Sequence, residues 1–242
     1  MSRPPGKLIF AGFAVAGLAV VLMVAFLNRE EPAPAEPSSD FVGAQRCAAC
    51  HQEKFEAWSG STHGLAGGTA DGDRVIGAFE GTVLRFKDAV VRLSKDAAGG
   101  HWFEVSITNQ SPQKFRADYV VGGGHMVGGG GQSYFSRFPD GTLRLLPFEW
   151  SNRDGPWFVQ TRNDNWQPVS PSISIFDCTV WPPHRVLGHS ENFEHNCQDC
   201  HGSQIQMAYD PIEKQHHTRF TSLAINCESC HGPGRDHIER VS

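Results

Sequence analysis

Three short cysteine and histidine motifs contain the residues of this sequence best suited to chemistry. Each has the spacing C-x-x-C-H, and they occupy 47–51, 197–201 and 227–231. On one helical turn, positions i, i+3 and i+4 share a face. Two thiols and one imidazole therefore project to the same side, which suits the two vinyl groups and the iron of one haem. The pattern predicts three covalently attached haem c groups.

We expect the six thiols to form thioethers and the adjacent imidazoles to bind iron. Zinc and disulfides use the same residue types and stay alternatives. Zinc ribbons combine two C-x-x-C pairs, whereas here the number of pairs is odd and each has its own histidine, which favours haem. The predicted cofactor-binding residues are Cys47, Cys50, His51, Cys197, Cys200, His201, Cys227, Cys230 and His231.

Of the 12 histidines, nine remain after His51, His201 and His231 are assigned as metal ligands. The second axial ligand decides whether a haem iron exchanges electrons or binds a small molecule. His63, after a short amphipathic stretch, and His237, beyond a Gly-Pro-Gly turn, are candidates for this role. His195 and His189 precede the second motif, and spacing does not choose between them.

Other residues of interest have simpler expected roles. His101 falls in an apparent strand, where a packing or surface role is favoured. His216 and His217 form an adjacent, solvated pair. His125 lies in the glycine-rich run 122–131. Two roles stay open for it: contact with iron or substrate, or a place in a flexible surface turn. Cys178 is expected to be a buried free thiol.

The bulk composition narrows the class of partner. The chain has 242 residues and a formal charge of -5, without a strongly basic patch. These values argue against nucleic acid as a partner. A mild negative charge is compatible with weak docking to the basic face of another redox protein.

The N-terminal region predicts export. Segment 8–27 is uncharged and, at helical rise, long enough to cross a bilayer. Arg3 and Lys7 precede it, which keeps 1–7 cytoplasmic and places the following chain on the periplasmic or extracytoplasmic side of the cell membrane. A signal peptide cleaved near 33–35 is the alternative. Segment 28–40 is rich in Pro, Glu and Ser and predicts a flexible tether before the domain 41–242.

The segment 82–148 predicts an antiparallel β meander. Short alternating runs are separated by turn residues at 98–100 and 139–141. The chain from 151 to 183 has little periodicity and several tryptophans, which suits either haem faces or an ordinary core. The predicted class is α+β: a transmembrane helix, then irregular or helical haem-binding segments with an antiparallel β insertion.

The exported part resembles the cytochrome c-554-like group of multihaem c-type cytochromes. The likeness runs from about Phe41 to His237 and includes FVGAQRCAACHQEKFEAWSGSTHGLA, DGTLRLLPFEW and CESCHGPGRDH. It implies bis-histidine haems in close pairs and exported electron transfer. It also implies that His63 and His237 are distal ligands, often to a haem other than the one nearest in sequence.

These features predict an electron carrier rather than an enzyme, working with other redox proteins or cytochromes within a larger assembly. Because the second and third motifs lie thirty residues apart, we expect their haems to be neighbours. The alternative is a reductase in which one haem iron lacks a protein ligand and acts on a small nitrogen compound or oxyanion. In that case His125 or Arg137 would donate protons or clamp an anion.

Overall fold

The computed structural model describes residues 40–123, 130–151, 157–163, 166–183, 193 and 197–241. The chain separates into two compact units, Met1–Glu36 and Pro37–Ser242, and every described residue belongs to the second. Within the described ranges, no helix combines the length and apolarity that crossing a bilayer requires. The segment 8–27 lies outside these ranges, as does nearly all of 28–40.

A four-stranded antiparallel sheet follows the predicted alternation. In β4 every second residue from His101 to Ile107 is buried, so that one face of the strand is on the core. The β3–β4 hairpin is closed by Asp96, whose carboxylate accepts hydrogen bonds from the amides of Ala98 and Gly100 at 2.9 and 2.8 Å. The sheet order is β2 (Val83–Arg85), β3 (Ala89–Lys95), β4 (His101–Ile107) and β5 (Gln113–Ala117).

A six-stranded antiparallel sheet forms the second layer. Its first strand, β1, follows the first motif and pairs with β6, with Gly67 opposite Val121. The register of β7 on β8 shifts between Ser133 and Phe135, which marks a bulge. The order is β1 (Gly67–Thr69), β6 (Tyr119–Val121), β7 (Gly131–Arg137), β8 (Leu143–Ser151), β9 (Trp157–Gln160) and β10 (Trp166–Pro168).

An aromatic core joins the two sheets. Phe103 of β4 has its ring centroid 5.5 Å from that of Tyr134 on β7 and 5.0 Å from that of Phe148 on β8. All three side chains are fully buried. Burying one such side chain contributes about 1.5–3 kcal/mol. The sheets therefore pack face to face as a sandwich.

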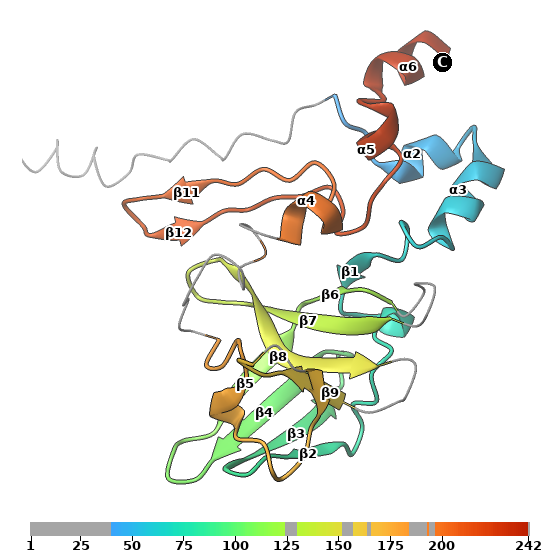
Figure 1. Ribbon diagram of the computed structural model, residues 1–242. Helices are drawn as coiled ribbons and strands as arrows, with labels where there is room; N and C mark the ends of the chain where they lie inside the picture. Colours follow the sequence, from blue (N-terminus) through green and yellow to red (C-terminus); the bar gives the residue numbers. More distant parts are fainter. Residues whose placement is uncertain are drawn as a thin grey trace, which may run out of the picture. The chain divides into compact units, whose positions relative to one another are not determined.

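The helices are short, and those that hold the first and third motifs gather together, apart from the sandwich (Figure 1). The amide of His51 donates to the carbonyl of Cys47 at 2.9 Å, and that of His231 to Cys227 at 3.0 Å. These motifs therefore form the single turn predicted from their spacing. The helices are α2 (Ala44–Ala48), α3 (Gln52–Ser59), α4 (Gln198–His201), α5 (Glu228–His231) and α6 (Arg235–Val241), with 3-10 turns at Gly72–Arg74 and Ile175–Asp177.

The predicted α+β class, with a membrane-spanning helix and helical haem-binding segments around a β insertion, is wrong. The described chain is mostly β-sheet, and its helices are short because a C-x-x-C-H motif needs only one turn. Glycines follow at the ends of α3, α4 and α5, and Gly232 after α5 has φ +77°. Strands also continue beyond 148, since β9 and β10 lie in the region expected to be irregular.

Candidate functional site

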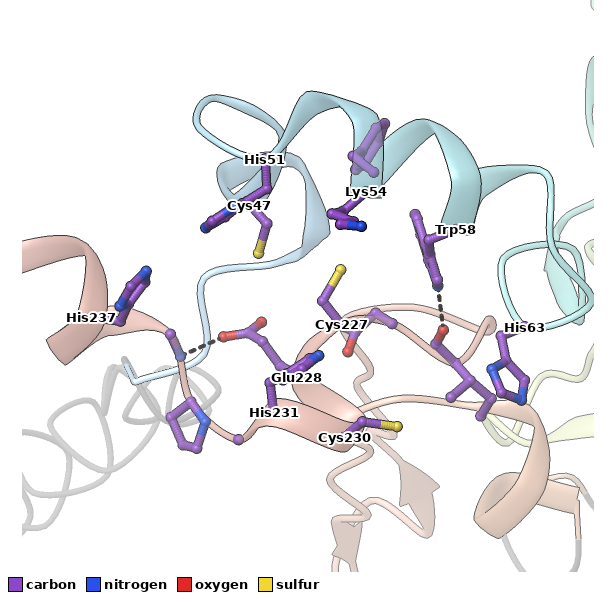
Figure 2. A pocket seen from close by; sticks show the side chains of 16 residues that line it. Cys47, His51, Lys54, Trp58, His63, Cys227, Glu228, Cys230, His231 and His237 are labelled. Atoms are coloured by element: carbon purple, nitrogen blue, oxygen red, sulfur yellow. Dashed lines mark hydrogen bonds between the residues drawn. The ribbon is translucent and has the colours of Figure 1, made fainter. Parts of the chain in front are cut away.

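A cavity of about 760 Å³ lies between the helices of the first and third motifs. Its volume falls within the roughly 300–1,000 Å³ typical of cofactor sites. Figure 2 shows side chains of α2, α3, α5 and α6 converging on it. Among its lining residues are Cys47, His51, Phe55, Trp58, His63, Cys227, Glu228, Cys230, His231 and His237.

The first thiols of the two motifs face one another across this cavity. Figure 2 shows the sulfur atoms of Cys47 and Cys227 pointing together. Burial, together with the neighbouring Cys227, raises the pKa of the Cys47 thiol. No disulfide joins any of the seven cysteines, all of which lie in the described ranges. The first and third motifs are thus direct neighbours, a pairing that sequence proximity did not predict.

Two imidazoles approach each other at one end of the cavity. The rings of His51 and His237 have centroids 6.2 Å apart and planes inclined by 21°. Metal–imidazole bonds are roughly 2.0–2.1 Å long, so two rings on opposite sides of one metal ion have centroids roughly 6 Å apart. The centroid separation is of that size, and the two rings form a nearly parallel, stacked pair.

His63 lines the same cavity at the side away from His237 (Figure 2). Its carbonyl accepts a hydrogen bond from the amide of Ile225 at 3.2 Å. The indole of Trp58 donates to the carbonyl of Ile225 at 2.7 Å. The two bonds fasten the end of α3 and the segment after it to the residues just before the third motif. The structure therefore brings both predicted distal histidines, His63 and His237, to the motifs.

The second motif lies against the six-stranded sheet. Cys197 packs on a buried cluster that includes Phe135 and Leu143 of β7 and β8. Burial lowers the pKa of His201, and the carbonyl of Ala66 partly offsets this. The Nδ1 atom of His201 is buried and has no hydrogen-bond partner in the structure. His195 and His189, the predicted distal candidates here, lie outside the described residues.

Hydrogen bonds join the second motif to the third. The hydroxyl groups of Ser203, just past α4, and Ser229, inside the third motif, lie 2.7 Å apart. Ser203 also donates to the carbonyl of Ala224 at 2.7 Å and accepts from the amide of Asn226 at 2.9 Å. The side-chain amides of Gln204 and Asn226 bond to one another twice. The third motif therefore contacts both of the others.

Sequence reasoning missed the two residues inside the third motif that make these junctions, Glu228 and Ser229. Any residue fits the x positions of C-x-x-C-H, so the motif itself gives no signal. A carboxylate inside the motif is the one sequence feature that could have drawn attention to Glu228, which is 4% exposed.

Several other expectations are resolved. His101 is a packing residue, buried against Phe79 with Nδ1 3.2 Å from the carbonyl of Ala70, and burial lowers its pKa. Cys178 is fully buried, which raises the pKa of its thiol to about 12. His216 is half-buried against Tyr209, whereas His217 is exposed. His125 lies outside the described residues.

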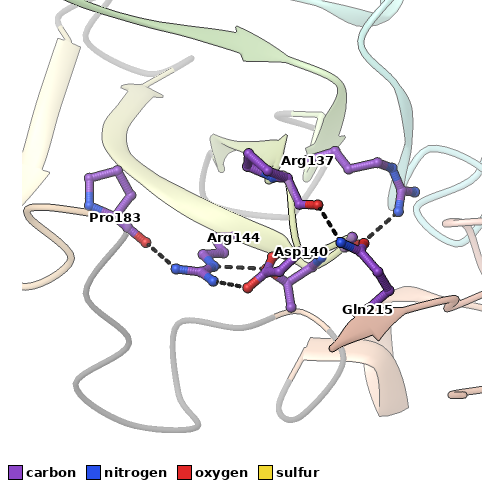
Figure 3. A network of polar contacts seen from close by, with 8 residues as sticks. Arg137, Asp140, Arg144, Pro183 and Gln215 are labelled. Carbon is purple, nitrogen blue, oxygen red and sulfur yellow. Dashed lines mark hydrogen bonds and ion pairs between the residues drawn. The ribbon is translucent and has the colours of Figure 1, made fainter. Parts of the chain in front are cut away.

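Arg137, the alternative anion clamp, is engaged near the β7–β8 turn. Its guanidinium donates to the carbonyl of Gly141 at 2.9 Å and to the hydroxyl of Tyr119 at 3.3 Å. Close by, the buried Arg144 forms an ion pair with Asp140 and donates to the carbonyl of Pro183 at 3.2 Å (Figure 3). Gln215 of β12 (Gln215–His216) bonds to Pro139 at 3.0 Å and fastens the hairpin with β11 (Tyr209–Asp210) to this turn.

The residues around the shared cavity fit a haem. Three thiols (Cys47, Cys227 and Cys230), the imidazoles of His51 and His231, and aromatic walls from Phe55 and Trp58, whose rings lie 5.4 Å apart, are the groups that a covalently bound macrocycle needs. Within the described part of the chain, no three His, Cys, Asp or Glu side chains converge as a metal cluster. A haem iron does not need such a cluster, because the porphyrin provides the remaining ligands.

Comparisons with known proteins give limited similarity. No family model and no curated protein matches the chain. Among solved structures, the chain is similar to the crystal structure of the outer cell wall cytochrome OcwA. The identity is 17%, and the TM-score of 0.47 is insufficient to assign a fold or a function. The match covers 84% of this chain and 34% of the cytochrome, so the chain spans about a third of its length. Membership of the cytochrome c-554-like group stays a prediction.

Proposed function

We propose that this chain is an exported c-type cytochrome that holds three covalent haems and passes single electrons between redox proteins. The observation that carries the proposal is the meeting of the first and third motifs at one cavity, where the rings of His51 and His237 lie 6.2 Å apart. When bound, each haem supplies reversible one-electron chemistry at its iron.

Different residues around the shared cavity would hold the first and the third haem. Cys47 and Cys50 would anchor the first haem and Cys227 and Cys230 the third, while His51 and His231 would bind their irons. His237, whose ring lies 6.2 Å from that of His51, would be the second histidine to bind the first haem. His63 would be the second histidine for the third haem, since its backbone is fastened just before the third motif.

The contacts between the three motifs suggest an order in which electrons would pass between their haems. The third motif adjoins the first through Cys47 and Cys227, and it adjoins the second through Ser203 and Ser229. A haem on the third motif would therefore lie between the other two. Cys197, Cys200 and His201 hold the second haem against the six-stranded sheet, where Cys197 packs on the Phe135 cluster.

The wider setting follows from the sequence. The apolar segment after Arg3 and Lys7 acts as the export signal, which places the haem domain on the extracytoplasmic side. Partners are other redox proteins or cytochromes. A formal charge of -5 disfavours nucleic acid and suits docking to a basic partner face.

The carrier and the reductase differ in the state of their iron. We expect optical and EPR spectra of the oxidised protein to show only low-spin iron, and the reduced protein to leave its spectrum unchanged under carbon monoxide. The reason is that each iron would bind two histidines, one of them His51, His201 or His231. A high-spin signal accompanied by carbon monoxide binding would contradict the carrier and favour the reductase.

A further inference from the structure

A single buried carboxylate connects three separate parts of the shared cavity. Glu228 is the residue after Cys227 in the third motif and is 4% exposed. Its Oε1 accepts hydrogen bonds from the amides of Val42 and Gly234, both at 2.9 Å, and its Oε2 accepts from Gly43 at 2.8 Å. A carboxylate only accepts hydrogen bonds, so three converging N–H donors suit its ionised form.

The three donors belong to the chain segments that carry the axial histidines. Gly43 immediately precedes α2, the helix that begins the first motif and leads to His51. Gly234 immediately precedes α6, which carries His237. A backbone bond from Arg235 to Asp40, at 3.1 Å, runs beside them. Glu228 thus lies at the junction of the segments that lead to His51 and His237.

The backbone around the carboxylate is shaped for this close approach. A Cβ atom placed on Gly234 would lie 3.2 Å from Oε1 of Glu228 and 3.0 Å from a methyl group of Val42. Gly43 has φ +81°, a conformation that favours glycine. Figure 2 shows the Glu228 side chain between the third motif and the segment before α6.

We propose that Glu228 is a positioning residue that sets the spacing of His51 and His237 and so fixes both axial ligands of the first haem. This inference rests on the proposed function, because it assigns those two imidazoles to one iron. The same carboxylate lines the cavity. Its negative charge stabilises the more positive, oxidised iron and lowers the reduction potential of the adjoining haems.

The test compares the full-length holoprotein with Glu228→Ala and Glu228→Gln, and with Glu213→Gln as the control. Glu213 is exposed in the β11–β12 turn, so its replacement removes one negative charge far from these contacts. Alanine removes every acceptor, whereas glutamine keeps the length and one acceptor oxygen. If the alanine variant does not accumulate, the glutamine variant decides.

We expect Glu228→Ala to retain three haems by mass while the EPR signal of one haem changes to high-spin or moves to new g-values. Hydrogen exchange at the amides of Val42, Gly43 and Gly234 should accelerate about tenfold or more, because each loses a bond to a charged acceptor. Glu228→Gln should show a smaller change in both readouts and a raised reduction potential. Glu213→Gln should match the wild type.

Unchanged EPR signals, potentials and amide exchange in both Glu228 variants would overturn the positioning role. Failure of the proposed function looks different, since the wild-type protein itself would then hold no haem. Amide exchange in that haem-free protein would still report whether Glu228 holds the two segments together, while the role in ligation would be rejected.

Discussion

His51 and His237 lie with their ring centroids 6.2 Å apart, although they come from opposite ends of the described chain. The contact exists because α2, α5 and α6 meet around one cavity. In the proposed function it gives the first haem a ligand, His237, that follows the third motif. Several consequences can be measured.

Replacing His237 should leave one haem iron without its second histidine ligand. We expect His237→Ala to convert about one third of the iron to high-spin and to create carbon monoxide binding, because alanine offers no axial nitrogen. EPR and carbon monoxide difference spectra provide the measurement. His217→Ala is the control, since His217 is exposed and lies outside the cavity. Carbon monoxide binding by both variants, or by neither, would contradict the assignment.

Ser203 should stabilise the junction between the second and third motifs. Its hydroxyl makes three polar contacts at 2.7 to 2.9 Å and is buried. We expect Ser203→Ala to lower the free energy of unfolding by about 1–3 kcal/mol, because the amide of Asn226 loses its acceptor. Denaturant unfolding measures this, with the exposed Ser94→Ala expected to stay within about 0.5 kcal/mol of the wild type. Equal effects would show that the junction is not stabilising.

Replacing Gly232 should lower the stability of the fold because of its backbone conformation. Its φ of +77° lies in the left-handed region, and a Cβ there would meet no atom within 4 Å, so any cost comes from backbone strain. We expect Gly232→Ala to destabilise the fold by about 1–2 kcal/mol. Gly60→Ala, at an ordinary φ of -87°, should cost less. A cost that is no greater at Gly232 than at Gly60 would be inconsistent with this reason.

Glu149 should make the sandwich less stable as pH rises. Burial raises the pKa of this carboxyl from 4.5 to about 7, although the Ser133 hydroxyl bonds to it at 2.9 Å. Below pH 4.5 both the folded and unfolded forms are protonated. Between 4.5 and 7 only the unfolded form ionises, so stability falls by up to about 3 kcal/mol and then levels off.

The variant Glu149→Gln isolates this effect. Glutamine does not titrate, so the difference in unfolding free energy between the variant and the wild type should change between pH 4.5 and 7 and stay constant above 7. Denaturant unfolding at pH 4.5, 6, 7 and 8 measures the difference. A constant difference across all four values would mean that Glu149 is ionised in the fold like an exposed carboxyl.

The strands could be predicted from the sequence because their alternation is local. The run from His101 to Ile107 matches β4, with one buried residue in every two. The fold class was wrong because the haem motifs need only single helical turns, while β9 and β10 are too short and irregular in pattern to stand out.

The candidate site was predictable in composition but not in arrangement. The C-x-x-C-H spacing pointed to Cys47, Cys227 and the other residues of their motifs. The spacing within a motif does not depend on where the motifs lie relative to one another, so it could not predict their arrangement. The meeting of the first and third motifs depends on long-range contacts, such as those from Glu228 to Val42 and Gly43, that leave no periodic signal. Sequence distance instead favoured the second and third motifs, whose link through Ser203 and Ser229 is also present.

The intact mass of the protein, matured in a host that attaches haem, tests the central claim most directly. We predict the mass of the recovered polypeptide plus three haem groups, and the loss of one group when Cys47 and Cys50 are both replaced by alanine. A Soret band should accompany that mass. A protein that weighs only as much as its amino acids, without Soret absorption, would contradict the account.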